Sequence, residues 1–272
     1  MQLSGSIVLY KSKEAVRKTI ESFLNTSLSV RLFLVDNSPT NDLEKFLSDY
    51  IEDSRVEYIF NNANIGFGAA HNIAIRRVYD QSIFHLVLNP DVSFCSGVLE
   101  TLVQYCEKDL NVGLVMPKIF YPDGTLQYAC KLLPTPSDLI FRRFLPSTFV
   151  RKRTEYFELR HAGYDNEMEV PYLSGCFMFL RTETLKKVGL FDERFFMYPE
   201  DIDLTRRIHQ KYKTMYFPKV SIIHQHEKGS YKSYRLLFIH ITNMIRYFNK
   251  WGWIFDRERK AINKQILAQL QK

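Results

Sequence analysis

The segment YPEDID, Tyr198 to Asp203, places three carboxylates in four positions directly after a proline. Proline in the first helical position and acids in the first turn both suit a helix start, because the helix dipole is positive there. A carboxylate can also act as the general base that takes a proton from a reacting hydroxyl. The pattern of Glu200, Asp201 and Asp203 therefore leaves two interpretations open, a helix start and a reaction centre.

Two further segments end apolar runs with residues that suit a metal. In HLVLNPDVSF, Asp91 follows the run; with diphosphate oxygens and water it could hold Mg²⁺ or Mn²⁺, although a Pro-Asp turn explains it too. In IIHQHEKGS, His224 and His226 lie on one face of an extended strand, and either could be the ligand. With His226, we assign Lys228 and Ser230 to the acceptor or diphosphate region.

Two earlier segments suit a nucleotide. Asp36 in LVDNS could accept hydrogen bonds from a base or sugar, and an Asx turn before the next helix is the alternative. In NNANIGFGAAHN, Gly66 and Gly68 permit close backbone approach and Asn64 offers an amide. The segment lacks both G-x-x-x-x-G-K-[ST] and G-x-G-x-x-G, so it is only compatible with a nucleotide site.

These residues need a scaffold that brings strand ends together. Short β-rich runs alternate with helix-period segments, which is typical of an α/β fold with a mostly parallel sheet, where ligands bind beyond the carboxyl ends of the strands. The predicted strands are residues 5–10, 31–36, 56–60, 83–89 and 112–117, and the predicted helices are 12–25, 41–51, 67–79 and 96–106.

The second half is less regular. Periodicity fades over residues 134–169, which we expect to form a mobile insertion or lid. We predict a catalytic domain over residues 1–230 and a helical extension over 231–272. After the insertion we predict a buried strand in YLSGCFMFLR, helices at 182–188 and 199–212, and strands at 214–217 and 220–224.

Composition limits the class of protein. The 272 residues are 46% hydrophobic and 25% charged, as in an ordinary globular protein. No run approaches the ~20 apolar residues that span a bilayer, and the first residues do not resemble a secretory signal, so we expect a cytoplasmic protein. Four cysteines without a C-x-x-C pair indicate buried thiols rather than a zinc site or disulfides.

The chain is basic, with a net charge of +7, which raises the alternative of a nucleic-acid-binding protein. The basic residues lie outside the predicted sheet and no recognised binding motif appears, so we expect no nucleic acid partner. Residues 231–272 interleave basic and aromatic residues, which suits an anionic membrane at the inner face of the cell membrane. Packing on the domain and a homodimer contact are the alternatives.

In order and spacing, these segments resemble the inverting family 2 glycosyltransferases with a GT-A fold, in particular the bacterial rhamnosyltransferase-like branch. The resemblance covers about residues 4–231. It implies a nucleotide-sugar donor, dTDP-rhamnose or alternatively a UDP-sugar, a divalent metal, and as acceptor a growing glycan or a lipid-linked glycan. It is carried by IVLYKS, LVDNS, NANIGFGAAHN, LNPDV, LSGCFMFLR, FDERFFMYPEDIDL and IIHQHEKGS.

The resemblance assigns residues on the donor side. Tyr10 and Asp36 would face the base and ribose, and residues 64–68 would line the nucleotide pocket. LNPDV takes the place of the metal-binding D-x-D, with Asn89 where the family has its first acid, so Asp91 is the expected direct ligand. His224 matches the late histidine of the metal and diphosphate shell.

On the acceptor side, the resemblance makes Asp201 the general base and Glu200 its neighbour at the acceptor. A base there would deprotonate the acceptor hydroxyl while its oxygen attacks the anomeric carbon opposite the diphosphate. Ser174 and Gly175 would lie beside the sugar, and we expect Asp203 to cap the helix or pair with one of the arginines at positions 206 and 207. A nucleotidyltransferase and a binding-only homologue are the alternatives.

Overall fold

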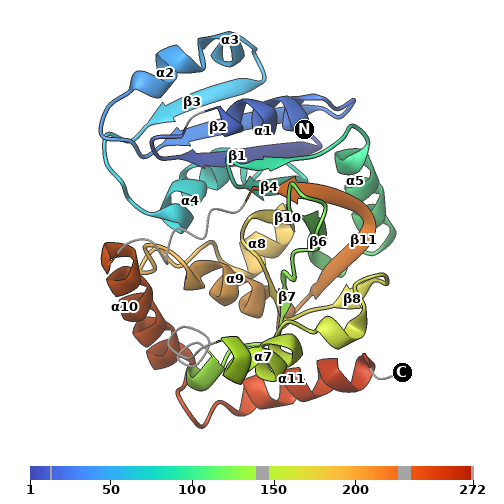
Figure 1. Ribbon diagram of the computed structural model, residues 1–272. Helices are drawn as coiled ribbons and strands as arrows, with labels where there is room; N and C mark the ends of the chain where they lie inside the picture. Colours follow the sequence, from blue (N-terminus) through green and yellow to red (C-terminus); the bar gives the residue numbers. More distant parts are fainter. Residues whose placement is uncertain (13, 139–146, 226–233, 271–272) are drawn as a thin grey trace.

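The computed structural model describes residues 1–12, 14–138, 147–225 and 234–270 (Figure 1). Its centre is a nine-stranded sheet in the order β3-β2-β1-β4-β10-β6-β11-β5, with β8 beside β11, and β7 pairs with β9 in a small second sheet. The strands are β1 (Leu3–Leu9), β2 (Val30–Asp36), β3 (Val56–Phe60), β4 (Phe84–Leu88), β5 (Val92–Ser93), β6 (Val112–Phe120), β7 (Cys130–Lys131), β8 (Met168–Glu169), β9 (Tyr172–Leu173), β10 (Phe177–Arg181) and β11 (Lys213–His224).

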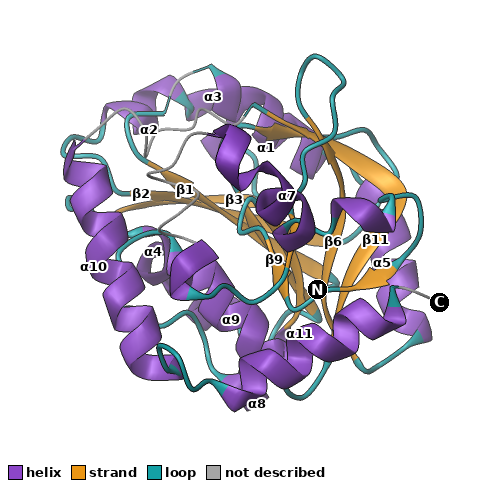
Figure 2. Ribbon diagram, turned by 60° about the horizontal axis from the view of Figure 1, so that its bottom comes forward, coloured by secondary structure: helices purple, strands orange, loops and turns teal. Residues whose placement is uncertain are grey.

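Helices cover both faces of this sheet (Figure 2). The described helices are α1 (Ala15–Leu24), α2 (Asp42–Phe46), α3 (Ser48–Ile51), α4 (Phe67–Val78), α5 (Val98–Lys108), α7 (Ser147–Phe157), α8 (Thr182–Val188), α9 (Pro199–His209), α10 (Tyr234–Trp251) and α11 (Arg257–Gln269). The alternation of β2 sets the two faces: Leu32 packs in the core that includes α1, and Phe33 packs with α4. Successive strand side chains point to opposite faces, so α1 and α4 lie on opposite sides.

Strand direction gathers one set of strand ends at one edge of the sheet. β1, β2, β3 and β4 are parallel, β6 and β11 are parallel, and β10 is antiparallel to its neighbours β4 and β6. The carboxyl ends of β1, β4 and β11 therefore lie at the same edge, where the amino end of β10 joins them. This arrangement confirms the predicted α/β fold with a mixed, mostly parallel sheet.

Three predicted elements differ in detail. The predicted helix over 41–51 is two short helices, α2 and α3, with Leu47 between them. YLSGCFMFLR is not one strand, because residues 174–176 turn between β9 and β10. The two predicted strands at 214–217 and 220–224 form the single strand β11, whose register shifts between Phe217 and Ser221, around Pro218, which has no N–H to donate to the ladder.

The described part of residues 134–169 is anchored in the core. α7 ends at Phe157, which is buried together with Leu159 and Tyr164. The Tyr164 hydroxyl donates to the carbonyl of Cys130 at 3.0 Å and of Glu158 at 2.7 Å. These contacts attach the end of the segment to β7, and its motion as a lid stays a prediction.

The C-terminal helices pack on the domain. α10 lies beside α9, and α11 runs below α7 (Figure 1). None of the helices in the described part of the chain is both long and apolar enough to cross a membrane. Cys106, Cys130 and Cys176 are buried as expected, whereas the prediction of a buried thiol is wrong for Cys95, which is exposed.

Candidate active site

The edge where the strand ends meet holds a cleft of about 650 Å³. Its lining comes from the residues after β4, the last residue of β11, the turn before β10 and the first turn of α9. The predicted site residues that line the cleft are Asn89, Asp91, Ser174, Gly175, Glu200, Asp201 and His224. The topology thus brings together residues that lie up to 135 positions apart in the chain.

Asp201 is held by backbone donors on both carboxylate oxygens. The N–H of Gly175 donates to Oδ2 at 3.0 Å and that of Ile202 to Oδ1 at 2.8 Å. A Cβ added to Gly175 would lie 3.0 Å from the Asp201 Cβ, so a glycine lets the turn approach this closely. Burial raises the pKa of Asp201 to about 6, although Lys131 and these N–H groups oppose the rise. Asp201 is therefore a fixed carboxylate that takes up a proton close to neutral pH.

Glu200, the neighbour of Asp201, differs from it in hydrogen bonding and in protonation. Its side chain is 4% exposed, and its Oε2 has no hydrogen-bond partner. Burial, together with the neighbouring charge of Asp201, raises the pKa of Glu200 well above its usual range. Two adjacent carboxyl groups in a buried turn cannot both ionise readily, so Glu200 stays neutral while Asp201 carries the charge.

Asp91 and His224, which also line the cleft, lie next to each other. Asp91 Oδ1 lies 3.3 Å from His224 Nε2; it is buried and accepts no geometrically regular hydrogen bond. Asn89 Nδ2 lies 3.4 Å from the same nitrogen, and Gln127 Oε1 lies 3.0 Å from Nδ1 on the other side of the ring. Burial opposes protonation, but Cys176 and Asp91 beside the ring raise the pKa of His224 to about 10.

This pair fits part of a metal shell. A divalent cation would displace the proton of the His224 ring, and Asp91 Oδ1 and the deprotonated Nε2 would then be suitable ligands for it. Among the described residues no group of three or more His, Cys, Asp or Glu side chains could hold a metal alone. Asp91 and His224 would thus supply two ligands and leave the others to a diphosphate and water.

Sequence reasoning missed two residues near this site, Gln127 and Lys131. Gln127 fixes His224 twice, because its Nε2 also donates to the His224 carbonyl at 2.7 Å. Lys131 in β7 lowers the pKa of Asp201 by its charge. Both follow the YPDGT turn, in a stretch with no motif, so no signal in the sequence pointed to them.

Several predicted donor residues do not line the cleft in this structure. Asp36 is buried, where its Oδ2 accepts from the Tyr58 hydroxyl at 2.5 Å and its Oδ1 from the Ser38 N–H at 2.8 Å. The second bond is the Asx turn that was the alternative interpretation. Tyr10 is 48% exposed at the end of β1. Donor contacts of Tyr10 and Asp36 stay predictions.

The glycine segment packs on the loop before α9. Gly66 has φ +95°, and a Cβ there would lie 2.5 Å from the carbonyl oxygen of Phe196. At Gly68 an added Cβ would meet Phe191 at 2.8 Å. Asn64 Oδ1 accepts from the Gly66 N–H at 3.2 Å. Protein packing explains these three residues, and their contact with a nucleotide stays a prediction. His226, Lys228 and Ser230 lie outside the described residues.

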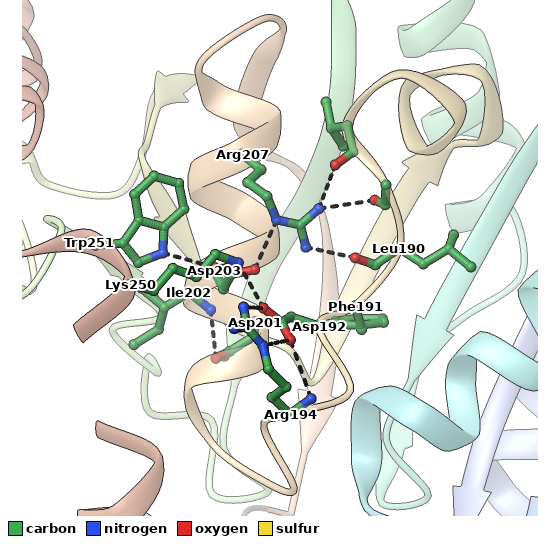
Figure 3. Close-up of polar contacts among 12 residues, drawn as sticks. Leu190, Phe191, Asp192, Arg194, Asp201, Ile202, Asp203, Arg207, Lys250 and Trp251 are labelled. Atoms are coloured by element: carbon green, nitrogen blue, oxygen red, sulfur yellow. Dashed lines mark hydrogen bonds and ion pairs between the residues drawn. The ribbon is translucent and has the colours of Figure 1, made fainter. Parts of the chain in front are cut away.

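The C-terminal helices hold α9 in place. Asp203 accepts from Arg207 Nε at 2.8 Å, as predicted for this pair, and from Trp251 Nε1 at 2.8 Å, with Lys250 Nζ 2.6 Å away (Figure 3). The predicted alternative partner, Arg206, points elsewhere.

Arg206 is 1% exposed and forms a bidentate pair with Asp256, at 2.7 and 2.8 Å. It also donates to Glu258 at 2.7 Å and lies over the ring of Trp251, 4.0 Å from the centroid. The extension thus packs on the helix that presents Asp201, which was one of the alternatives for residues 231–272.

Comparisons with known proteins agree with this architecture. "N-acetylglucosaminyl-diphospho-decaprenol L-rhamnosyltransferase" of Mycobacterium tuberculosis is 26% identical over 211 residues, which cover 74% of this chain and 68% of that protein. "Rhamnosyltransferase WbbL" of Escherichia coli is 25% identical over 268 residues, or 94% of this chain and 96% of the relative.

The crystal structure of "GalNAc-T7 with UDP, GalNAc and Mn2+" aligns with a TM-score of 0.62 at 16% identity, which shows a shared fold. The alignment covers 82% of this chain and 43% of the solved one, so this chain spans less than half of that protein. The family model for "Glycosyl transferase family 2" matches residues 6–189, more than half of the chain, from within β1 to just past α8. The chain therefore belongs to glycosyl transferase family 2.

Proposed function

We propose that this protein transfers L-rhamnose from dTDP-rhamnose, with inversion, to a hydroxyl of a growing, lipid-linked bacterial surface polysaccharide. The observation that carries the proposal is Asp201, a carboxylate with a raised pKa, fixed by two N–H donors in a cleft that faces Asp91 and His224. Rhamnosyl transfer is supported by the names of two relatives, one with a diphospho-decaprenol acceptor. A UDP-sugar donor is the alternative.

The base would act from the α9 side of the cleft. Asp201 accepts the proton of the acceptor hydroxyl as the oxygen attacks the anomeric carbon, and the nucleoside diphosphate leaves on the opposite side. Inversion needs no covalent intermediate with the protein. Glu200, neutral beside the base, lets Asp201 keep the single negative charge of the pair.

The leaving group would lie on the strand-end side. A divalent cation held by Asp91 and His224 would stabilise the charge of the departing diphosphate. Gln127 Oε1 lies 3.0 Å from Nδ1 of the His224 ring, and Gln127 Nε2 donates to the backbone carbonyl of His224 at 2.7 Å. The other ring nitrogen, Nε2, lies 3.3 Å from Asp91 Oδ1. Such positioning of a ligand by a neighbouring amide is typical of histidine metal ligands.

A lipid-linked acceptor would also place the protein at the inner face of the cell membrane. The basic, aromatic extension over residues 231–272 supports this location. The donor, the glycan acceptor and the membrane surface are then the three partners of the protein.

A donor panel tests the proposal. Nucleoside diphosphate release is measured for dTDP-rhamnose and UDP-sugars, with and without EDTA, on the wild type, on Asp201→Asn and on Asp165→Asn as an exposed control. We expect release from dTDP-rhamnose, loss with EDTA, and a loss of about 10²- to 10⁴-fold in Asp201→Asn alone. Absence of both turnover and binding for every donor would refute the enzymatic proposal. Full turnover in Asp201→Asn would refute only the assignment of Asp201 as the general base.

A further inference from the structure

α10 connects the cleft to the outside of the molecule. On its inner face, the His240 ring packs edge-on against Tyr198, with 4.9 Å between centroids, and Asn243 Nδ2 donates to the Met197 carbonyl at 2.9 Å. Met197 and Tyr198 both line the cleft. A ligand on the outer face of α10 would therefore lie only one helix diameter, about 10 Å, from the cleft wall.

That outer face carries a row of exposed apolar side chains. With 3.6 residues per turn, positions 234, 238, 241 and 245 fall within about 60° of arc. Tyr234 is 93% exposed, Phe238 71%, Ile241 39% and Ile245 44%. α10 lies at the edge of the molecule in both overall views (Figures 1 and 2). Apolar residues in register along a helix edge differ from the isolated exposed residues that any protein surface has.

The loop after α10 extends the row. Trp253 folds back so that its Nε1 donates to Asn249 Oδ1 at 2.8 Å, one turn beyond Ile245. Ile254 is 69% exposed and Phe255 88%. An indole with its N–H satisfied at the edge of an apolar row suits the boundary between lipid and water.

The charged side chains of α10 itself are all basic. α10 contains no Asp or Glu in its 18 residues. Its Lys250 is paired with two aspartates, whereas no ion pair joins Arg246 or Arg257 to a carboxylate in the described part of the chain. Both arginines are exposed; Arg246 Nη1 donates to the Arg194 carbonyl at 2.6 Å and to Asn243 Oδ1 at 3.1 Å, and Arg257 follows the loop directly. Cations next to exposed apolar side chains complement an anionic lipid surface.

We propose that the outer row of α10 and the loop at 253–255 dock the protein on an anionic bilayer. The apolar side chains insert between the headgroups, and Arg257 lies at the lipid phosphates. A second copy fits this face less well, because a two-fold contact would bring like-charged arginines together. The role of this docking rests on the proposed function. If the acceptor is lipid-linked, docking brings the cleft wall at Met197 and Tyr198 close to the membrane that holds the acceptor.

Vesicle binding tests the surface. The full chain is sedimented with vesicles of phosphatidylglycerol and phosphatidylcholine, and with phosphatidylcholine alone. Phe238→Asp and Phe255→Asp are compared with Phe149→Asp, which changes an 82% exposed aromatic on α7. We expect binding to the anionic vesicles only, weakened by about tenfold or more in each of the first two variants and unchanged in the control. Donor turnover with a lipid-free acceptor stays at the wild-type level in all three.

Equal binding to both kinds of vesicle, or wild-type binding by the two variants, would overturn the docking surface. Self-association that Phe238→Asp abolishes, without any vesicle binding, would assign the face to a second copy instead. Failure of the proposed function looks different: the protein would bind anionic vesicles through this face but turn over no nucleotide sugar.

Discussion

The pKa of Asp201 determines the pH at which sugar transfer should fail. Burial raises this pKa from 3.8 to about 6, against the charge of Lys131 and the N–H groups of Gly175 and Ile202. At pH 7 about nine tenths of such a carboxylate is ionised, and at pH 5 about one tenth. An ordinary exposed aspartate would still be more than about nine tenths ionised at pH 5. The proposed base therefore predicts an acid limb that an aspartate in water would not give.

The assay is kcat/KM from nucleoside diphosphate release between about pH 4.5 and 8.5. We expect a fall of about tenfold from pH 7 to pH 5, with the inflection near pH 6. Near-UV circular dichroism at each pH separates loss of the base from loss of the fold. An inflection near pH 4, or none at all, would refute the assignment of Asp201 as a buried base.

Three variants test which neighbouring groups set the pH of the inflection. Lys131→Met removes a charge that lowers the pKa of Asp201, so the inflection should move to higher pH, whereas Lys131→Arg keeps the charge and should leave it in place. Glu200→Gln replaces a carboxyl group that is already neutral, so the inflection should stay near pH 6. A shift to lower pH in Lys131→Met would contradict the electrostatic account.

Three predictions concern stability. The pKa of Asp201 in the folded protein, about 6, lies above the usual value of 3.8, so its charge destabilises the fold increasingly as pH rises from about 4 to about 6. Asp201→Asn should therefore add about 1–3 kcal/mol to the free energy of unfolding at pH 8 and less at pH 4, measured by urea titration. Arg206→Met leaves Asp256 buried without its bidentate partner and should cost about 3–5 kcal/mol, against less than about 1 kcal/mol for Arg194→Met in a pair whose arginine is 70% exposed. Burial lowers the pKa of His85 to about 3, so stability should fall as pH drops below about 6.5, by up to about 1.4 kcal/mol per pH unit, and His85→Gln should flatten that slope.

The sequence predicted those parts of the site that strand ends position. Asp91 and His224 follow apolar runs, and parallel strands bring such ends to one edge, so their meeting follows from the pattern and the topology. Asp201 lies in the first turn of α9, and the sequence predicted both that helix and its acidic start. The close approach of Gly175 was not predictable, because the turn between β9 and β10 looks like part of a continuous strand in the sequence.

Contacts between segments without motifs could not be predicted. Gln127 reaches His224 from 97 positions away, and nothing in its neighbours marks it as a partner. The packing of the extension depends on the pair between Arg206 and Asp256. In the sequence, Arg206 has the pattern of an ordinary surface arginine on a helix, so this pair could not be predicted. A basic, aromatic pattern indicates that a helix has an apolar face and a charged one, but only the fold decides which face is covered.

The two interpretations of YPEDID are compatible, and their combination explains the unequal acids. Pro199 begins α9 and two acids occupy its first turn, where the helix dipole favours negative charge. The dipole alone would lower the pKa of both Glu200 and Asp201, yet both are raised, so burial outweighs it. Two N–H donors reach only Asp201, which decides where the single charge resides. A helix start thus becomes a base because the surrounding packing, including the C-terminal helices that hold α9, excludes water from both acids, while only Asp201 has the N–H groups of Gly175 and Ile202 to stabilise its charge.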